Sequence, residues 1–351
     1  MSELVALKRK RLDYIDLLRV LAICGVISFH FLYSAIARGR TPNVSFSPIS
    51  EWAKYGYLGV ELFFMISGFV MAQSVRDLTF RQFISKRFLR LYPTYWLALL
   101  IIFAISSFGF WKKPGPGAQE LYFNLTMFPT ALGSSWLDAA HWFMARQLQF
   151  YLAISLILLL RLGKYLNTIF VSWAVIACAW YFLGLPTFHI WYLNGFFALI
   201  TGGAIINIIR EFGFTPFRIL GLIASYLWAI DSRMAKTRWL NENRGPGHSA
   251  LIIVLVISAV FILMSLTWNA HVSNFPIRGA AFAGTLSYPI YLVHDHIGGL
   301  AIAQFGTDTN KYYLYIIVVL FAILLGYSLL KIERKIMSLF SHKSRRMQKL
   351  V

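Results

Sequence analysis

Long apolar blocks separated by short polar loops organise this 351-residue chain. The blocks are about 20 residues long, which is the length that crosses a bilayer as a helix. A transmembrane β-barrel would instead show segments of about 10 residues with alternating polarity, and the sequence lacks that alternation. The pattern therefore predicts an all-α, polytopic integral membrane protein.

About ten transmembrane helices are predicted. They cover residues 14–36, 56–75, 91–110, 139–161, 167–184, 190–209, 216–231, 249–268, 278–300 and 312–332. The apolar segment Leu121–Ser135 is too short for a span and contains Pro129, which favours an interfacial or re-entrant piece. The chain then divides into a basic N-terminus at 1–13, a transmembrane domain at 14–332 and a basic tail at 333–351.

The distribution of Lys and Arg predicts the orientation of these spans. With both termini cytoplasmic, the inner segments hold about 21 Lys and Arg and the outer loops about 10, as the positive-inside rule requires. The largest outer loop of this topology, Asp231–His248, is itself basic and runs against the rule. The basic tail is expected to lie at the anionic inner leaflet, so membrane lipid is an expected partner.

Composition supports a membrane protein over a nucleic-acid-binding one. The chain is 58% hydrophobic and 13% charged, whereas a soluble domain carries about 25% charged residues. The net charge of +19 comes from short loops and termini, and no nucleic-acid-binding module is recognisable, so no nucleic-acid partner is expected. Cys24 and Cys178 lie inside apolar blocks and imply no disulfide framework.

Arg19 and His30 are the first candidates for chemistry, because both lie inside the first apolar block. Eleven residues make about three helical turns, so the two side chains share one helix face about 16 Å apart. Ionisable residues inside a membrane helix are costly and are functional candidates by default. The spacing indicates a polar track through the bilayer.

Further ionisable residues are predicted at one depth in the membrane. At 1.5 Å per residue from each span midpoint, His30, Glu61, Arg146 and His294 fall about 6–7 Å to the outer side, and Arg19 falls about 9 Å to the inner side. Each also has a structural interpretation. A lone histidine can bond a neighbouring helix, and Glu61 could be the ion-pair partner of Arg19 or Arg146.

Two other motifs were weighed for metal binding and nucleophilic catalysis. His294-Asp295-His296 resembles a metal triplet, but adjacent side chains on a helix point about 100° apart, so no metal is expected. Ser67 could be a nucleophile only with a base beside it, and its predicted depth places it away from His30. Gly56, Gly59 and Gly68 are interpreted as sites of close helix packing.

Arg87 and Arg90 lie at positions i and i+3 where a basic inner loop meets the third span. The positive-inside rule alone predicts basic residues in this loop. It does not predict two arginines on one helix face at the membrane boundary. Guanidinium groups suit phosphate, so a phosphorylated cytosolic ligand is inferred.

Four motifs in this order resemble the acyltransferase-3 family of membrane O-acyltransferases. They are Arg11-Leu-Asp-Tyr-Ile-Asp-Leu-Leu-Arg19 with His30, Gly59-Val-Glu61-Leu-Phe-Phe-Met-Ile-Ser67-Gly68-Phe69, Lys86-Arg87-Phe-Leu-Arg90-Leu-Tyr-Pro93-Thr-Tyr95, and Ser287-Tyr-Pro-Ile-Tyr291-Leu-Val-His294. The resemblance runs from about Arg11 to the last span. In the fourth region, where the family commonly has a glutamate, this chain has Gln147 preceded by Arg146.

The resemblance implies transfer of an acetyl or other short acyl group from cytosolic acyl-CoA to a hydroxyl of a cell-envelope glycan or lipid-linked sugar. It also implies a multi-pass protein of the bacterial inner membrane, with acetyl-CoA as a substrate and no bound cofactor. His30 would be the general base or a transient acyl carrier, and Glu61 would orient or charge-balance it. Arg19, Arg87 and Arg90 would bind the acyl-CoA.

Lesser site candidates are His294, Tyr291, Ser67, Arg146 and Gln147. Two other classes of function remain open at the level of sequence. A proton-coupled transporter or exporter of a glycan or small molecule would use His30, Glu61 and His294 as a relay. A structural subunit of a polysaccharide assembly complex would need neither Arg19 nor His30.

Overall fold

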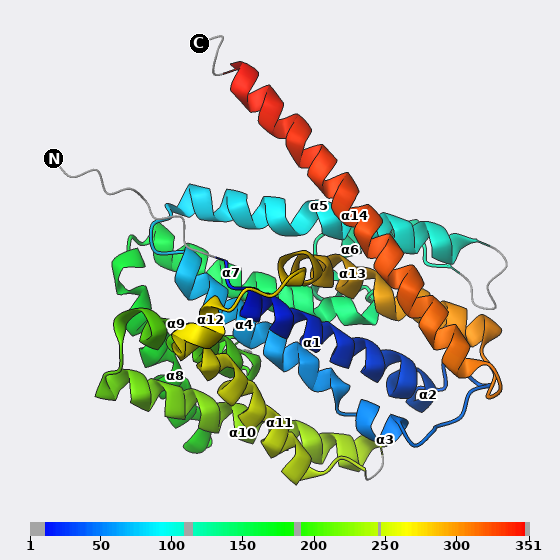
Figure 1. Cartoon of the computed structure of the whole chain (residues 1–351), viewed down its shortest axis with the longest axis horizontal. Helices are drawn as coiled ribbons and strands as arrows, with labels where there is room; N and C mark the ends of the chain where they lie inside the picture. The colour runs from blue at the N-terminus through cyan, green and yellow to red at the C-terminus, as the bar shows by residue number, and fades with distance from the viewer. Residues whose placement is uncertain (1–10, 109–114, 186–190, 245–246, 348–351) are drawn as a thin grey trace. The chain divides into compact units, whose positions relative to one another are not determined.

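The protein is helical throughout the part that its computed structural model describes, which is residues 11–108, 115–185, 191–244 and 247–347 (Figure 1). No strand occurs within these ranges. The basic run Lys8-Arg9-Lys10 of the predicted N-terminal segment lies outside the described residues, as do Trp111–Pro114 at the start of the predicted outer loop.

Each predicted span coincides with one principal helix. The principal helices are α1 (Asp13–Phe29), α4 (Gly59–Ser74), α5 (Phe80–Ser107), α7 (Trp142–Leu159), α8 (Leu166–Phe182), α9 (Phe196–Phe212), α10 (Pro216–Arg244), α11 (Ala250–Ser265), α13 (Ala280–Phe305) and α14 (Lys311–Met347). Of these, α5, α10 and α14 extend well beyond their predicted spans at one end. Shorter pieces are the π-helical turn η1 (His30–Ser34), α2 (Ala35–Ala37), α3 (Ser50–Ala53), η2 (Gly56–Leu58), α6 (Ala118–Asn124), η3 (Pro129–Leu132), η4 (Ala139–His141), η5 (Gly163–Tyr165), η6 (Trp191–Leu193), η7 (Leu266–Trp268) and α12 (Ala270–Asn274).

Seven helical segments among the described residues are long and apolar enough to cross a membrane. They are Asp13–Ala37, Ser50–Ser74, Phe80–Ser107, Ala139–Leu159, Gly163–Phe182, Ala250–Trp268 and Lys311–Ile336. The other three predicted spans correspond to α9, α10 and α13, which are helices but are not among the seven. The segment Leu121–Ser135 holds parts of two short helices, α6 and η3, and neither is long enough to cross.

One predicted loop is largely helical. Asp231–His248 was expected to be an outer loop, but α10 continues as one helix to Arg244. The residues after Asp231 include good helix formers such as Met, Ala, Lys and Arg, and no glycine or proline interrupts them before Gly245-Pro246. The basic residues that disagreed with the positive-inside rule therefore lie on a helix, and Arg233 among them is buried.

The chain forms two compact units, and it passes from one to the other within α1, α4, α7 and α13 and just before α5. The first unit contains Met1–Val20, Glu61–Thr79 and Leu156–Gly284. Its α9 is buried along Phe197–Ile209, as expected of a helix that is apolar on all sides. A Cβ at Gly68 would collide with the carbonyl of Ile200, so glycine is what lets α4 and α9 pack backbone to backbone.

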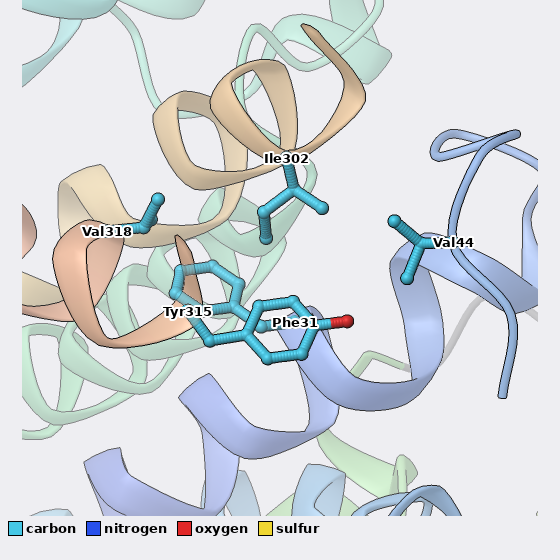
Figure 2. Close-up of a cluster of buried hydrophobic side chains, with 5 residues drawn as sticks. All are labelled: Phe31, Val44, Ile302, Tyr315 and Val318. Carbon is cyan, nitrogen blue, oxygen red and sulfur yellow. The ribbon is translucent and has the colours of Figure 1, made fainter. Parts of the chain in front are cut away.

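The second unit contains Leu21–Val60, Phe80–Ser155 and Thr285–Val351. A buried apolar cluster joins the end of the first span to α13 and α14. Figure 2 shows its five side chains, which are Phe31, Val44, Ile302, Tyr315 and Val318. Close packing at Gly56 and Gly59 also occurs here, since a Cβ at either position would collide with backbone of the first span. The predicted packing role of these glycines is confirmed.

Candidate functional site

His30 begins the π-helical turn η1, at the point where α1 ends. Such a turn widens the helix locally and is frequent at functional sites. The next residue, Phe31, is buried in the apolar cluster and lies against Gly298 of α13, where a Cβ would collide with its ring. The sequence therefore seats this turn directly against α13, the helix that carries His294.

Three ionisable side chains from two helices meet beside this turn. The Nδ1 atom of His30 lies 3.0 Å from Oδ1 of Asp295. The rings of His30 and His294 lie edge to face with centroids 5.1 Å apart. The side chains of His30 and Asp295 are 11% and 5% exposed, and His294 is wholly buried. His30 and His294, two of the four residues predicted at one depth, therefore lie side by side.

Asp295 is the residue that sequence reasoning missed. It was considered only as part of the triplet His294-Asp295-His296, and the carboxylate instead faces a histidine 265 positions earlier in the chain. Its Oδ1 atom also lies 3.5 Å from Nη1 of Arg40, while Oδ2 has no hydrogen-bond partner within the described ranges. Among the described residues no group of three or more His, Cys, Asp or Glu is arranged to hold a metal.

His294 presents one nitrogen for further contacts. Its Nδ1 atom donates to the carbonyl of Tyr291 over 2.8 Å, which in a neutral ring leaves Nε2 as an acceptor. That Nε2 has no hydrogen-bond partner in the part of the chain that is described. The hydroxyl of Tyr291 donates to the carbonyl of Ala140 over 2.5 Å, so Tyr291 anchors α13 to the start of α7.

Two buried side chains form hydrogen bonds with backbone groups of α13 beside Asp295. The amide of His296 donates to Oδ2 of Asp138 over 3.0 Å, and Nε2 of His141 donates to the carbonyl of Leu292 over 2.8 Å. His296 and Leu292 are the i and i−4 partners of a regular helix. Asp138 and His141 thereby set the position of the turn that carries Asp295.

Arg19 lies in the first unit and is paired within α1. It contacts Oδ1 of Asp16, whose other oxygen contacts Arg11. The carboxyl of Asp16 is fully buried, and the Cβ of this residue lies against Gly284. Sequence reasoning missed Asp16 as the partner of Arg19, although its i−3 spacing on a helix was a signal for it.

Glu61 also lies in the first unit, where its partner is neither Arg19 nor Arg146. Its Oε1 atom accepts a hydrogen bond of 2.6 Å from Nη1 of Arg233 on α10, and both side chains are buried. Oε2 has no hydrogen-bond partner among the described residues. The guanidinium of Arg233 also lies over the ring of Phe196 at 4.3 Å, so this pair ties α4, α9 and α10 together.

The candidate donor-binding arginines of the second unit lie on α5. Arg87 is largely buried, with its guanidinium 5.3 Å from the ring of Phe83 and 5.4 Å from the ring of Tyr151 on α7. Arg90, one turn further on, is exposed. On α7, Gln147 precedes Tyr151 by one helical turn and so shares its helix face.

Gln147 and Arg146 differ in their hydrogen bonding. Gln147 is 3% exposed, and neither of its amide atoms has a hydrogen-bond partner in the described ranges. Arg146 donates to Oε1 of Gln149 on the same helix over 2.9 Å. Ser67 is partly buried on α4, and within the described ranges no histidine or carboxylate hydrogen-bonds it. The structure therefore shows no catalytic base beside Ser67.

The helical fold, the membrane-length segments and the buried His30–Asp295 pair define a multi-pass membrane protein with an ionisable centre. A comparison with family models identifies it further. The family model described as "Acyltransferase domain" matches residues 12–337, nearly the whole chain. The protein belongs to this acyltransferase-3 family.

One curated relative is similar to part of the chain. It is the peptidoglycan O-acetyltransferase OatA of Listeria monocytogenes serovar 1/2a, which is 30% identical over 107 residues. The match covers 28% of this chain and 14% of the relative. No solved structure gives a significant match.

Proposed function

We propose that this protein transfers an acetyl group from acetyl-CoA on the cytosolic side to a hydroxyl of a cell-envelope glycan. The observation that carries the proposal is the buried pair His30–Asp295. Membership of the acyltransferase family supports acyl transfer as the reaction, and the relative named for peptidoglycan O-acetylation supports a glycan as the acceptor. The proposed location is the inner membrane of a bacterium, with both termini in the cytoplasm.

The pair suits general base catalysis. Asp295 faces Nδ1 of His30, so it favours the tautomer with the proton on Nδ1 and leaves Nε2 to accept a proton. Nε2 of His30 takes the proton of the acceptor hydroxyl as its oxygen attacks the thioester carbonyl carbon. The C–O bond forms, the C–S bond breaks, and the imidazolium returns the proton to the departing CoA thiolate. Asp295 stabilises the imidazolium between these two transfers.

The arginines are assigned to the donor. Arg87 and Arg90 lie one turn apart on α5, and guanidinium groups bind phosphate in a bidentate manner. In the first unit, Arg19 is by itself a candidate for binding a phosphate group, with Asp16 holding its side chain in place. Glu61 and Arg233 form a buried ion pair, and we assign Glu61 to orienting the helices of the first unit.

The proposal is tested with His30→Ala in a strain that lacks the chromosomal copy of the gene. We expect loss of O-acetyl groups from the envelope glycans, measured by mass spectrometry at equal protein level. His271→Ala is the matched control because His271 is exposed, and it should leave acetylation unchanged. Full acetylation with His30→Ala contradicts the role of His30.

A second measurement separates enzyme from transporter. The purified chain in liposomes is given labelled acetyl-CoA and envelope glycan. Thioester consumption supports acyl transfer. Glycan flux without thioester consumption would instead support a transporter with His30 in a proton relay.

A further inference from the structure

A pocket of about 480 Å³ in the second unit adjoins the candidate centre. This is within the roughly 300–1,000 Å³ range of small-molecule sites. Its polar and aromatic lining comes from Arg40, Ser106, Glu120, Trp136, His296 and Gln304.

The pocket shares residues with the buried ionisable cluster. Arg40 lines it and reaches Oδ1 of Asp295. His296 lines it and follows Asp295 directly in α13, with its Nε2 atom 2.8 Å from the hydroxyl of Ser106. A molecule in the pocket therefore contacts Arg40, which reaches the carboxylate of Asp295, and His296, which follows Asp295 in the chain.

The loop wall of the pocket is held in place by Asn124, which is fully buried. Its amide nitrogen donates to the carbonyls of Glu120 and Ser135, and its amide oxygen accepts from the backbone of Leu137. Its own carbonyl accepts a hydrogen bond of 2.8 Å from the hydroxyl of Tyr95 on α5. Hydrogen bonds within the protein thus hold the wall that carries Glu120 and Trp136.

The lining mixes hydrogen-bond donors and acceptors without an excess of one charge. The guanidinium of Arg40 lies beside the carboxylate of Asp295, and the carboxylate of Glu120 accepts a hydrogen bond from the hydroxyl of Ser135. Gln304 adds an amide, which both donates and accepts. Hydroxyl groups of a sugar also donate and accept, and the apolar face of a sugar ring can lie on an indole such as that of Trp136. An anionic ligand would instead meet the carboxylate of Glu120.

We infer that this pocket holds the sugar residue of the acceptor glycan, and that this residue is uncharged. The inference rests on the proposed function, because it names the acceptor for that reaction. In the predicted topology the segment Leu121–Ser135 belongs to the outer side of the membrane, where an envelope glycan is available. Arg40 and His296 then connect acceptor binding to the His30–Asp295 pair.

The test blocks the pocket chemically. Ala303 lines the pocket, and Ala303→Cys changes its volume little. Intact cells producing this variant are treated from outside with a bulky, membrane-impermeant thiol reagent. Thr309→Cys, at an exposed position after α13, is the matched control. The wild-type chain treated alike reports any effect at Cys24 and Cys178.

We expect labelled Ala303→Cys to lose at least tenfold of the glycan O-acetylation, while purified labelled protein still binds acetyl-CoA as the wild type does. We also expect mass spectrometry of the wild-type product to place the acetyl group on a sugar without a carboxylate or phosphate. Undiminished acetylation after labelling, or loss of acetyl-CoA binding with it, overturns the pocket assignment. Acetylation of an anionic sugar overturns the claim of an uncharged acceptor. If wild-type cells carry no O-acetyl groups, the proposed function itself fails.

Discussion

Replacing Asp295 by asparagine removes one charge beside His30 and leaves the side-chain volume almost unchanged. Two unit charges 3.0 Å apart attract by about 5–6 kcal/mol at an effective dielectric constant of about 20. Arg40, at 3.5 Å from the same oxygen, offsets part of this attraction. We therefore take about 3 kcal/mol as the stabilisation that Asp295 gives to the imidazolium, which corresponds to about a 100-fold loss of rate in Asp295→Asn.

The rate is measured as acetyl-CoA consumption by the purified chain in liposomes with envelope glycan as acceptor. Glu242→Gln is the control, because Glu242 is an exposed carboxylate near the end of α10. In a His30→Ala background, Asp295→Asn should lower the rate of acetyl-CoA consumption little further, because the two residues act together. A loss below threefold in Asp295→Asn, or full additivity with His30→Ala, would refute the reasoning.

Three further results are expected. Gly298→Ala should lower the free energy of unfolding by about 1–3 kcal/mol, because the added Cβ would collide with the buried ring of Phe31. Gly299→Ala is the control, because its Cβ would meet open space, and it should not lower the midpoint of thermal unfolding. Equal midpoints for the two variants would contradict the close packing of Phe31 on Gly298. Asp308 accepts hydrogen bonds from the amide and hydroxyl of Ser45 and lies beside Lys311, and these contacts lower its pKa to about 2. This carboxylate therefore contributes stability that is fully present above its ordinary pKa of 3.8 and is lost as the pH falls through 2. Asp308→Asn should unfold at a lower temperature than wild type at pH 5, and the difference should be much smaller at pH 2. A difference that does not change with pH would be the contrary result. Glu61→Gln should lower the free energy of unfolding by about 3–5 kcal/mol, because it leaves the buried charge of Arg233 unpaired. The double variant Glu61→Leu with Arg233→Met should recover much of that loss, measured by thermal unfolding. A double variant no more stable than Glu61→Gln would argue against the ion pair.

The helices themselves were largely predictable from the sequence. About 20 consecutive apolar residues have few structures open to them in lipid other than a helix, because backbone groups must be hydrogen-bonded within the segment. Seven of the predicted spans therefore coincide with helices to within several residues at either end. The exceptions are α5, α10 and α14, where polar residues outside the apolar block continue the helix back to Phe80, on to Arg244 and on to Met347.

Relations within one helix were also predictable. Helical spacing alone determines that Arg19 and His30 share a face, and both lie in the continuous segment Asp13–Ala37. The acyltransferase family could be identified in the same way, because its motifs are read along the chain. Counting residues from the ends of two separate spans placed His30 and His294 at one depth, and in the structure their ring centroids lie 5.1 Å apart.

Only the tertiary structure decided which charges pair. Asp295 faces His30, and Glu61 pairs with Arg233, across 265 and 172 positions of sequence. Depth along a helix axis follows from counting residues, but the direction of a side chain around that axis relative to another helix does not. That direction depends on how the helices pack, which the glycine contacts and the Phe31 cluster set here. The sequence by itself determined the helices, their motifs and the family, and the packing decided that the partner of His30 is Asp295.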